Sequence, residues 1–473
     1  MKQMNRDCRK GKDMKKENWI FVIVSFICIG AVLVILYFYK INKYSYTLNI
    51  PSEDSVYNIN LEQNGKRVVV TEKDKIKDVI YIIGDVKRVT TNESVHDNPI
   101  NINNEIKIDF ENIAGYQFST DCISDNIITK MLIYGKNATG KTNLGKALID
   151  IVYLMIVESV YVENSMMLNA DSSEDYAKFS YTFGFGDDEI VYQYTRFSNR
   201  ELRDEELIIN GISVFKCDFL RGEYEFINLK YIDAETANVE RYLQSLEVEE
   251  TVEENRKARL PFLKWLIGNV ALKNDSVLNR LINYVRGMMM ITIGNGMSYR
   301  SRRMNDGFFE YLEDSENLND LEEFFNEMGI ECKLALKKLP DEHNELYFAH
   351  EKLIPFLSNA SSGTLALLTL YRRLIFRVKE ASLVYLDEFD AFYHYEMAQN
   401  VIQFLKKKYP RCQIIMTSHN TNLMTNRLMR PDCLFILSSS GTLTSLCNAT
   451  QRELREGHNL EKMYISGEFE KYE

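Results

Sequence analysis

The chain has 473 residues, 45% hydrophobic and 26% charged, which excludes a wholly disordered protein and predicts two or three globular domains. Its 57 lysines and arginines against 68 aspartates and glutamates give a net charge of −11, which argues against a generally basic nucleic-acid coat. The 8 cysteines are scattered without a CxxC pair, so we expect reduced thiols on a cytosol-facing body.

The N-terminal region contains an uncharged apolar run over residues 19–39. About 20 helical residues span a hydrocarbon core, and Trp19, Tyr37 and Tyr39 stand where interfacial aromatic residues belong. A cleaved signal peptide would have a shorter apolar core and a small-residue cleavage site, which is missing here. The run therefore predicts one transmembrane helix in the cell membrane, preceded by a basic tail over residues 1–18.

A small domain is expected behind this helix, over residues 44–100. Strand-like runs at 57–63 and 66–71 flank an Asn-Gly pair, which is a strong hairpin signal. Apolar residues then recur at helical spacing over 76–83. This hairpin-plus-helix α+β unit resembles a small domain of unknown function that is usually found just behind N-terminal membrane anchors.

The remainder of the chain, residues 105–473, alternates between strand and helix patterns, which predicts an α/β core with a parallel sheet. The expected elements are strands at 106–110 and 131–134, a helix over 143–158, an antiparallel β meander between 177 and 215, a mostly helical insertion over about 236–330, and strands at 383–386, 413–416 and 434–437.

A phosphate-binding loop is predicted over Gly135–Thr142, which fits G-x-x-x-x-G-K-[ST] between a strand and a helix. Glycines such as Gly135 and Gly140 let backbone N–H groups close around phosphate oxygens, and the helix N-terminus adds partial positive charge. Lys141 is expected to reach the β- and γ-phosphates and Thr142 to ligate Mg²⁺. ATP and Mg²⁺ are therefore the expected cofactors.

Two carboxylates, Asp387 and Glu388, end an apolar strand. Such a strand can deliver Asp387 to the Mg²⁺ site and Glu388 to the attacking water, where it would act as the general base. The alternative is a strand capped by two solvated acids, and the phosphate-binding loop disfavours it. The pair therefore predicts ATP hydrolysis.

Two further elements are candidates for phosphate contact. The sequence Ser361–Thr364 precedes an apolar helix expected over 365–379, and a helix N-terminus with serine and glycine is an anion site. His419 follows another strand, where it can sense a γ-phosphate. The same tetrapeptide recurs at 439–442 between two strand runs, and there it predicts a hairpin turn.

The order of these motifs over about 105–460 resembles the ABC-type ATPases of the RecF, SMC and overcoming-lysogenization-defect class. Many of these have an AAA-type core, and several belong to abortive-infection systems of phage defence. The matching residues are Asn137 in the loop, Ser361, Ser362 and Gly363 in the signature turn, Asp387 and Glu388 as the Walker B pair, Asp390 and His394 beyond it, and His419 as the switch histidine. Two residues depart from the pattern: Ala138 replaces a usual glycine, and Tyr395 stands where proline is common.

The resemblance implies an α/β P-loop NTPase with an ABC-type core, a β meander and a helical insertion. It also implies a nucleotide-dependent homodimer in which each ATP lies between the Lys141 loop of one chain and the Ser362 turn of the other, with Asp390 near the seam. The expected function is a membrane-anchored ATPase that switches its assembly state, in phage defence with an unidentified partner. A DNA-repair ATPase contacting nucleic acid through its insertion, and a nucleotide-gated scaffold without turnover, stay open as alternatives.

The topology also stays open. Seven lysines and arginines precede the apolar run and only Lys40 and Lys43 follow it closely, so the positive-inside rule places the rest of the chain outside the cell. ATP and reduced thiols belong to the cytosol, which favours a cytoplasmic ATPase domain. We give the chemistry more weight than the charge rule.

Overall fold

The computed structural model divides into two compact units, Met1–His96 and Asp97–Glu473. The residues whose structure it describes are 59–63, 66–70, 106–156, 174–197, 201–249, 260–293, 307–340, 342–376 and 381–472.

The first unit contains the predicted hairpin. Strands β1 (Ile59–Gln63) and β2 (Lys66–Val70) pair antiparallel, with Gln63 opposite Lys66. The basic tail, the apolar run over 19–39 and the helix expected over 76–83 lie outside the described residues. Among the residues that are described, no helix combines the length and the apolar character needed to cross a membrane.

The second unit is built around a six-stranded sheet with the order β11-β15-β16-β5-β17-β18, parallel except for the last pair. Its strands are mostly apolar, as expected of a sheet that helices cover on both faces. All five residues of β15 are buried. The strands are β5 (Lys130–Tyr134), β11 (Met288–Thr292), β15 (Leu383–Asp387), β16 (Gln413–Ser418), β17 (Leu434–Leu437) and β18 (Leu443–Ser445).

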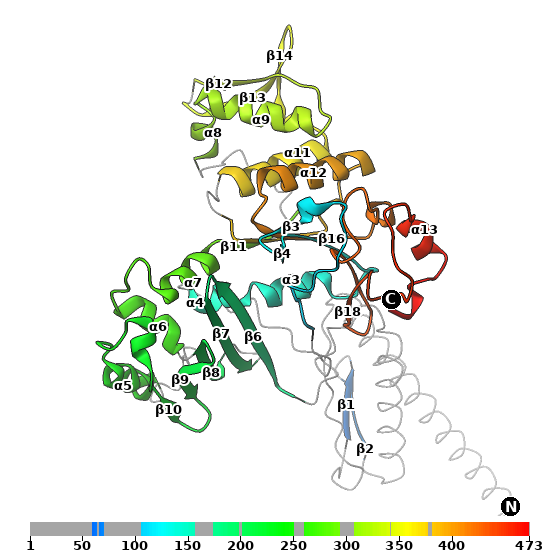
Figure 1. Ribbon diagram of the computed structural model, residues 1–473. Coiled ribbons are helices and arrows are strands. Elements are labelled where there is room, and N and C mark those ends of the chain that lie inside the picture. The colour runs from blue at the N-terminus through cyan, green and yellow to red at the C-terminus, as the bar shows by residue number, and fades with distance from the viewer. Residues whose placement is uncertain are drawn as a thin grey trace, which may run out of the picture. The chain divides into compact units, whose positions relative to one another are not determined.

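Helices on the two sides of this sheet carry the predicted motifs. Figure 1 shows α3 (Lys141–Leu148) on one side and the pair α11 (Ser362–Tyr371) and α12 (Tyr395–Lys408) on the other. A π-helical turn over Arg372–Phe376 continues α11. The repeated tetrapeptide at 439–442 connects β17 to β18, and the Ser438 N–H donates to the Thr442 carbonyl, so the predicted hairpin turn is confirmed.

The predicted meander forms a second sheet, with the order β10-β9-β8-β7-β6 and its own apolar core. Figure 1 shows helices α5 to α7 gathered beside it. The elements are β6 (Tyr176–Phe185), β7 (Asp188–Phe197), β8 (Leu202–Ile209), β9 (Ile212–Asp218), β10 (Glu223–Glu225), α4 (Asp150–Met155), α5 (Val239–Glu249), α6 (Phe262–Asn269) and α7 (Val277–Arg286).

A third, three-stranded sheet was not predicted. It lies beyond α11 and α12 in Figure 1. Phe324, on the helix beside this sheet, contacts Tyr371 of α11 at 5.3 Å and Phe404 of α12 at 4.9 Å between ring centroids. The elements of this layer are α8 (Phe308–Tyr311), α9 (Ser315–Glu327), β12 (Leu334–Lys338), β13 (Asn344–Ala349), β14 (Leu353–Pro355) and α10 (Phe356–Asn359); near the C-terminus lies α13 (Leu460–Ile465).

Two sequence-based expectations are wrong, and a third is incomplete. Residues 106–110 form no strand: their apolar side chains pack on the core, and the Phe110 carbonyl oxygen accepts a backbone hydrogen bond from Ile128 at 2.8 Å without a strand ladder forming. The helix expected over 143–158 is interrupted at Ile149, because Asp150 is held by β7 and begins a new helix. The described part of the insertion over 236–330 is mostly helical, as predicted, but it also contains β11, whose apolar run pairs with β15 in the central sheet.

Candidate nucleotide-binding site

The phosphate-binding loop connects β5 to α3 in a conformation that requires small residues. Gly140 precedes the helix at φ 94°, and Ala138 has φ 64°, a left-handed value that is costly for a residue with a Cβ atom. A Cβ atom on Gly135 would lie 2.6 Å from Thr139 Oγ1. Gly135 and Gly140 are therefore steric requirements of the loop, whereas Asn137 has no contact here that assigns it a role.

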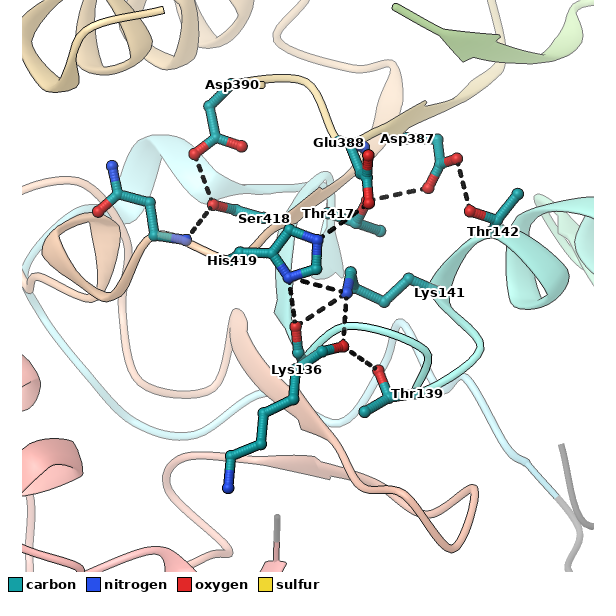
Figure 2. A network of polar contacts seen from close by, with 12 residues as sticks. Lys136, Thr139, Lys141, Thr142, Asp387, Glu388, Asp390, Thr417, Ser418 and His419 are labelled. Atoms are coloured by element: carbon teal, nitrogen blue, oxygen red, sulfur yellow. Dashed lines mark hydrogen bonds and ion pairs between the residues drawn. The ribbon is translucent and has the colours of Figure 1, made fainter. Parts of the chain in front are cut away.

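Lys141, the first residue of α3, turns its ammonium group back into the loop. Its Nζ donates to the carbonyl oxygens of Gly135 at 2.8 Å and Lys136 at 2.9 Å, and lies 3.2 Å from His419 Nδ1 (Figure 2). Burial lowers the pKa of Lys141 to about 8, although nearby carboxylates led by Glu388 oppose that shift. A bound phosphate would take over these hydrogen bonds and favour the charged form of the amine.

Asp387, the last residue of β15, joins the loop helix to the neighbouring strand. Its two carboxylate oxygens accept from Thr142 Oγ1 at 2.8 Å and from Thr417 Oγ1 at 3.2 Å. Burial raises its pKa, and the two hydroxyl hydrogen bonds act in the opposite direction. Hydroxyl and carboxylate oxygens are ligands that suit Mg²⁺, so the chemistry of Thr142 and Asp387 fits the metal-binding role predicted for them.

Nucleotide phosphates and water would have to complete that coordination. No group of three or more His, Cys, Asp or Glu side chains able to hold a metal occurs in the part of the chain that the structure describes. Mg²⁺ keeps several waters and shares the phosphate oxygens in sites of this kind. The site therefore fits a metal that arrives with its nucleotide.

Glu388 and His419 face each other across the ends of β15 and β16. Glu388 has φ 47°, and its backbone N–H donates to Thr417 Oγ1 at 2.8 Å. Its Oε1 lies 2.9 Å from His419 Nε2, and His419 Nδ1 lies 2.9 Å from the Gly135 carbonyl oxygen (Figure 2). The left-handed backbone, which costs about 1–3 kcal/mol, thus aims the carboxylate at the histidine.

The histidine has two alternative contacts at Nδ1. With a proton on Nε2 alone, Nδ1 can accept from the Lys141 ammonium; with both nitrogens protonated, Nδ1 can only donate to the Gly135 carbonyl. In both states Nε2–H donates to Glu388. The ring therefore links the candidate general base to the phosphate-binding loop.

The remaining predicted residues lie in two places. Asp390 follows this pair closely and accepts from Ser418 Oγ at 2.6 Å, while burial raises its pKa. Ser361, by contrast, caps α11, where its Oγ accepts from the Thr364 N–H at 3.1 Å. A Cβ atom on Gly363 would lie 2.8 Å from the Phe392 carbonyl oxygen, which explains the glycine.

The signature turn does not meet the phosphate-binding loop within one chain. Ser362 and Gly363 begin α11 and Ser361 caps it, and this helix lies on the opposite side of the central sheet from α3 (Figure 1). None of the hydrogen bonds that the structure gives for the described residues joins this turn to Lys141. Within one chain, the phosphate-binding loop, the Walker B pair and His419 therefore contact one another, whereas the signature turn lies away from them.

Sequence reasoning missed two residues of the site. Thr417 bonds both Asp387 and the Glu388 N–H, and its position two residues before His419 in an apolar strand was the available signal. Tyr385 is fully buried, and its hydroxyl donates to the Lys141 carbonyl oxygen at 2.6 Å. A tyrosine inside an apolar run gives no sign of such a partner.

Comparison with known families decides the class. Residues 130–425 match a family model described as "AAA domain, putative AbiEii toxin, Type IV TA system", which covers more than half of the chain. The chain belongs to this AAA-domain family. The match confirms the P-loop ATPase class that the motifs predict. Residues 44–127 match a domain of unknown function (DUF5300), which starts at the predicted boundary and extends past the predicted end at residue 100.

Solved structures similar to this AAA-domain protein include heads of SMC proteins. An SMC head bound to the C-terminal winged-helix domain of ScpA is 14% identical, with 67% of this chain and 90% of that chain covered and a TM-score of 0.34. The SMC head of Thermotoga maritima is 15% identical, with coverages of 66% and 89% and a TM-score of 0.31. The ScpA-bound head from Pyrococcus furiosus is 15% identical, with coverages of 72% and 94% and a TM-score of 0.33. No curated protein matches the chain.

Proposed function

We propose that this AAA-domain protein is an ABC-type ATPase that binds and hydrolyses ATP with Mg²⁺. The observation that carries the proposal is the convergence of Lys141, the Thr142–Asp387 pair and the Glu388–His419 pair at the ends of adjacent strands. Together these groups supply a phosphate ligand, a metal site and a general base, all next to the phosphate-binding loop at the ends of β15 and β16.

ATP binding by Lys141 is tested by the Lys141→Ala variant. We expect ATP affinity to fall about 10- to 100-fold, because charge-assisted hydrogen bonds to phosphate are lost. Equilibrium binding of labelled ATP with Mg²⁺ gives the measurement. Lys146→Ala is the matched control, since Lys146 lies exposed on the same helix and should leave the affinity unchanged. Equal affinities for Lys141→Ala and the wild type would contradict the proposal.

The biological role that we propose is a nucleotide-driven change of assembly state in phage defence, with a homodimer as the closed form. The family description, which names an abortive-infection toxin, supports the defence role. The dimer is supported by the position of the Ser361–Gly363 turn, which lies away from its own loop and whose two serines are exposed. A single loop covers one side of a triphosphate, and a second helix N-terminus can satisfy the remaining oxygens.

Membrane anchoring through residues 19–39, with the ATPase domain in the cytoplasm, is also part of the proposal. It rests on the apolar run in the sequence and on the need for cytosolic ATP. We expect the full chain to sediment with membranes and a chain lacking residues 1–43 to stay in the supernatant. Protease added to intact cells should leave residues 106–473 undigested, and digestion there would place the ATPase domain outside.

A further inference from the structure

Tyr385 and Asp387 hold two consecutive residues of the loop helix. Both lie on β15, and because residues two apart on a strand face the same side, the ring and the carboxylate both point to α3. The Tyr385 hydroxyl donates to the Lys141 carbonyl oxygen at 2.6 Å, and Asp387 accepts from the Thr142 hydroxyl at 2.8 Å.

Gly145 provides the space that this tyrosine needs. It lies four residues after Lys141 and hence on the same face of α3. A Cβ atom on Gly145 would lie 2.5 Å from both Cδ1 and Cε1 of the Tyr385 ring. Glycine inside a helix is less favourable than alanine, and the close approach of the ring gives the physical reason for it here.

The structure assigns Tyr385 the role of a positioning residue for the Mg²⁺ site. The contact of its ring with Gly145 determines how closely β15 approaches α3. Its hydroxyl group determines the position of the first turn of α3 along the strand. Both determine where the Thr142 hydroxyl stands relative to the Asp387 carboxylate. The inference rests on the proposed function, because it takes Thr142 and Asp387 as the metal residues.

The Tyr385→Phe variant tests the hydroxyl. We expect the Mg²⁺ concentration that half-saturates tight ATP binding to rise about 3- to 10-fold, the effect of one net hydrogen bond. ATP affinity in EDTA should change less than about 2-fold, because the loop still binds phosphate without the metal. A purely structural role would instead weaken ATP binding equally with and without Mg²⁺, and that result would overturn the assignment.

The matched control is Tyr242→Phe. Tyr242 is equally buried, and its hydroxyl donates to the Leu260 carbonyl oxygen at 2.8 Å, within the core of the second sheet. The exchange therefore removes the same kind of hydrogen bond away from the site. We expect it to leave the Mg²⁺ requirement unchanged; an increase equal to that of Tyr385→Phe would overturn the assignment.

A double-mutant cycle tests the fit of the ring on the glycine. Gly145→Ala alone should raise the half-saturating Mg²⁺ concentration about 10-fold or more, because the new methyl group collides with the ring. In a Tyr385→Leu background the same change should add less than about 2-fold, since the smaller side chain leaves room. Equal effects of Gly145→Ala in both backgrounds would overturn the inference.

The wild-type protein separates this inference from the proposed function. If it binds no ATP with Mg²⁺, both fail. If it binds ATP in a Mg²⁺-dependent way and Tyr385→Phe has the same Mg²⁺ requirement, the proposed function stands and only the positioning role is overturned.

Discussion

Replacing Glu388 with glutamine is expected to slow ATP hydrolysis about 100-fold or more and to leave ATP binding nearly unchanged. A general base contributes about 10²–10⁴-fold, and glutamine removes its basicity. The amide oxygen can still accept the hydrogen bond from His419 Nε2, so the link between the histidine and the loop is kept. Phosphate release under single-turnover conditions, together with ATP affinity, gives the measurement.

Glu310→Gln is the control for this substitution. Glu310 lies exposed on α8, outside the site, and the same loss of one negative charge should leave turnover as in the wild type. Unchanged turnover in Glu388→Gln would exclude Glu388 as the base and would remove the main argument for hydrolysis.

The same Glu388→Gln variant should accumulate the ATP-bound homodimer, because the nucleotide that holds two copies together is no longer consumed. Its mass in solution, with the ATP concentration well above that needed for saturation, should be that of two chains. Adding Ser362→Arg should return it to one chain, since the substitution places a bulky side chain in the turn that would face the partner's nucleotide. A persistent monomer in the single variant would exclude the dimer.

Removing the Asp432 carboxylate is expected to destabilise the AAA domain by about 3–5 kcal/mol, because it leaves a buried guanidinium without its main counter-ion. Asp432 is fully buried and Arg430 is 4% exposed. The carboxylate accepts from Arg430 Nε at 2.9 Å and Nη2 at 2.6 Å, and also from the Ala114 N–H at 2.7 Å. The carboxylate therefore ties the start of the domain, at Ala114, to the turn that precedes β17.

Urea unfolding of Asp432→Ala, followed by circular dichroism, measures this effect. The control is Glu453→Ala, which breaks an ion pair with Arg455 whose side chains are 78% and 73% exposed. Surface pairs contribute about 0–1 kcal/mol, so the control should unfold almost as the wild type does. Equal midpoints for the two variants would show that the buried pair adds no more than a surface pair.

The local part of the site could be predicted from the sequence. A glycine-rich turn between an apolar strand and a helix is specified by neighbouring residues. Gly135, Gly140, Lys141 and Thr142 therefore lie where predicted, in the loop between β5 and α3 and at the start of α3. The same holds for β15 with Asp387 at its end, because a short apolar strand ended by charges needs no distant information. The β meander was also predictable, since alternation along each strand reports its two faces.

Only the tertiary structure decided what depends on partners far apart in the chain. The run at β11 reads as part of a helical segment, and pairing with β15 makes it a strand. The run at 106–110 alternates like a strand but forms none, although the Ile128 N–H donates a backbone hydrogen bond to the Phe110 carbonyl oxygen. The order of the strands likewise brings His419 to Glu388. The close packing of α3 on β15 brings the Tyr385 hydroxyl to the Lys141 carbonyl oxygen. Sequence periodicity reports which face of an element is apolar, whereas contacts between elements depend on which of them pack together.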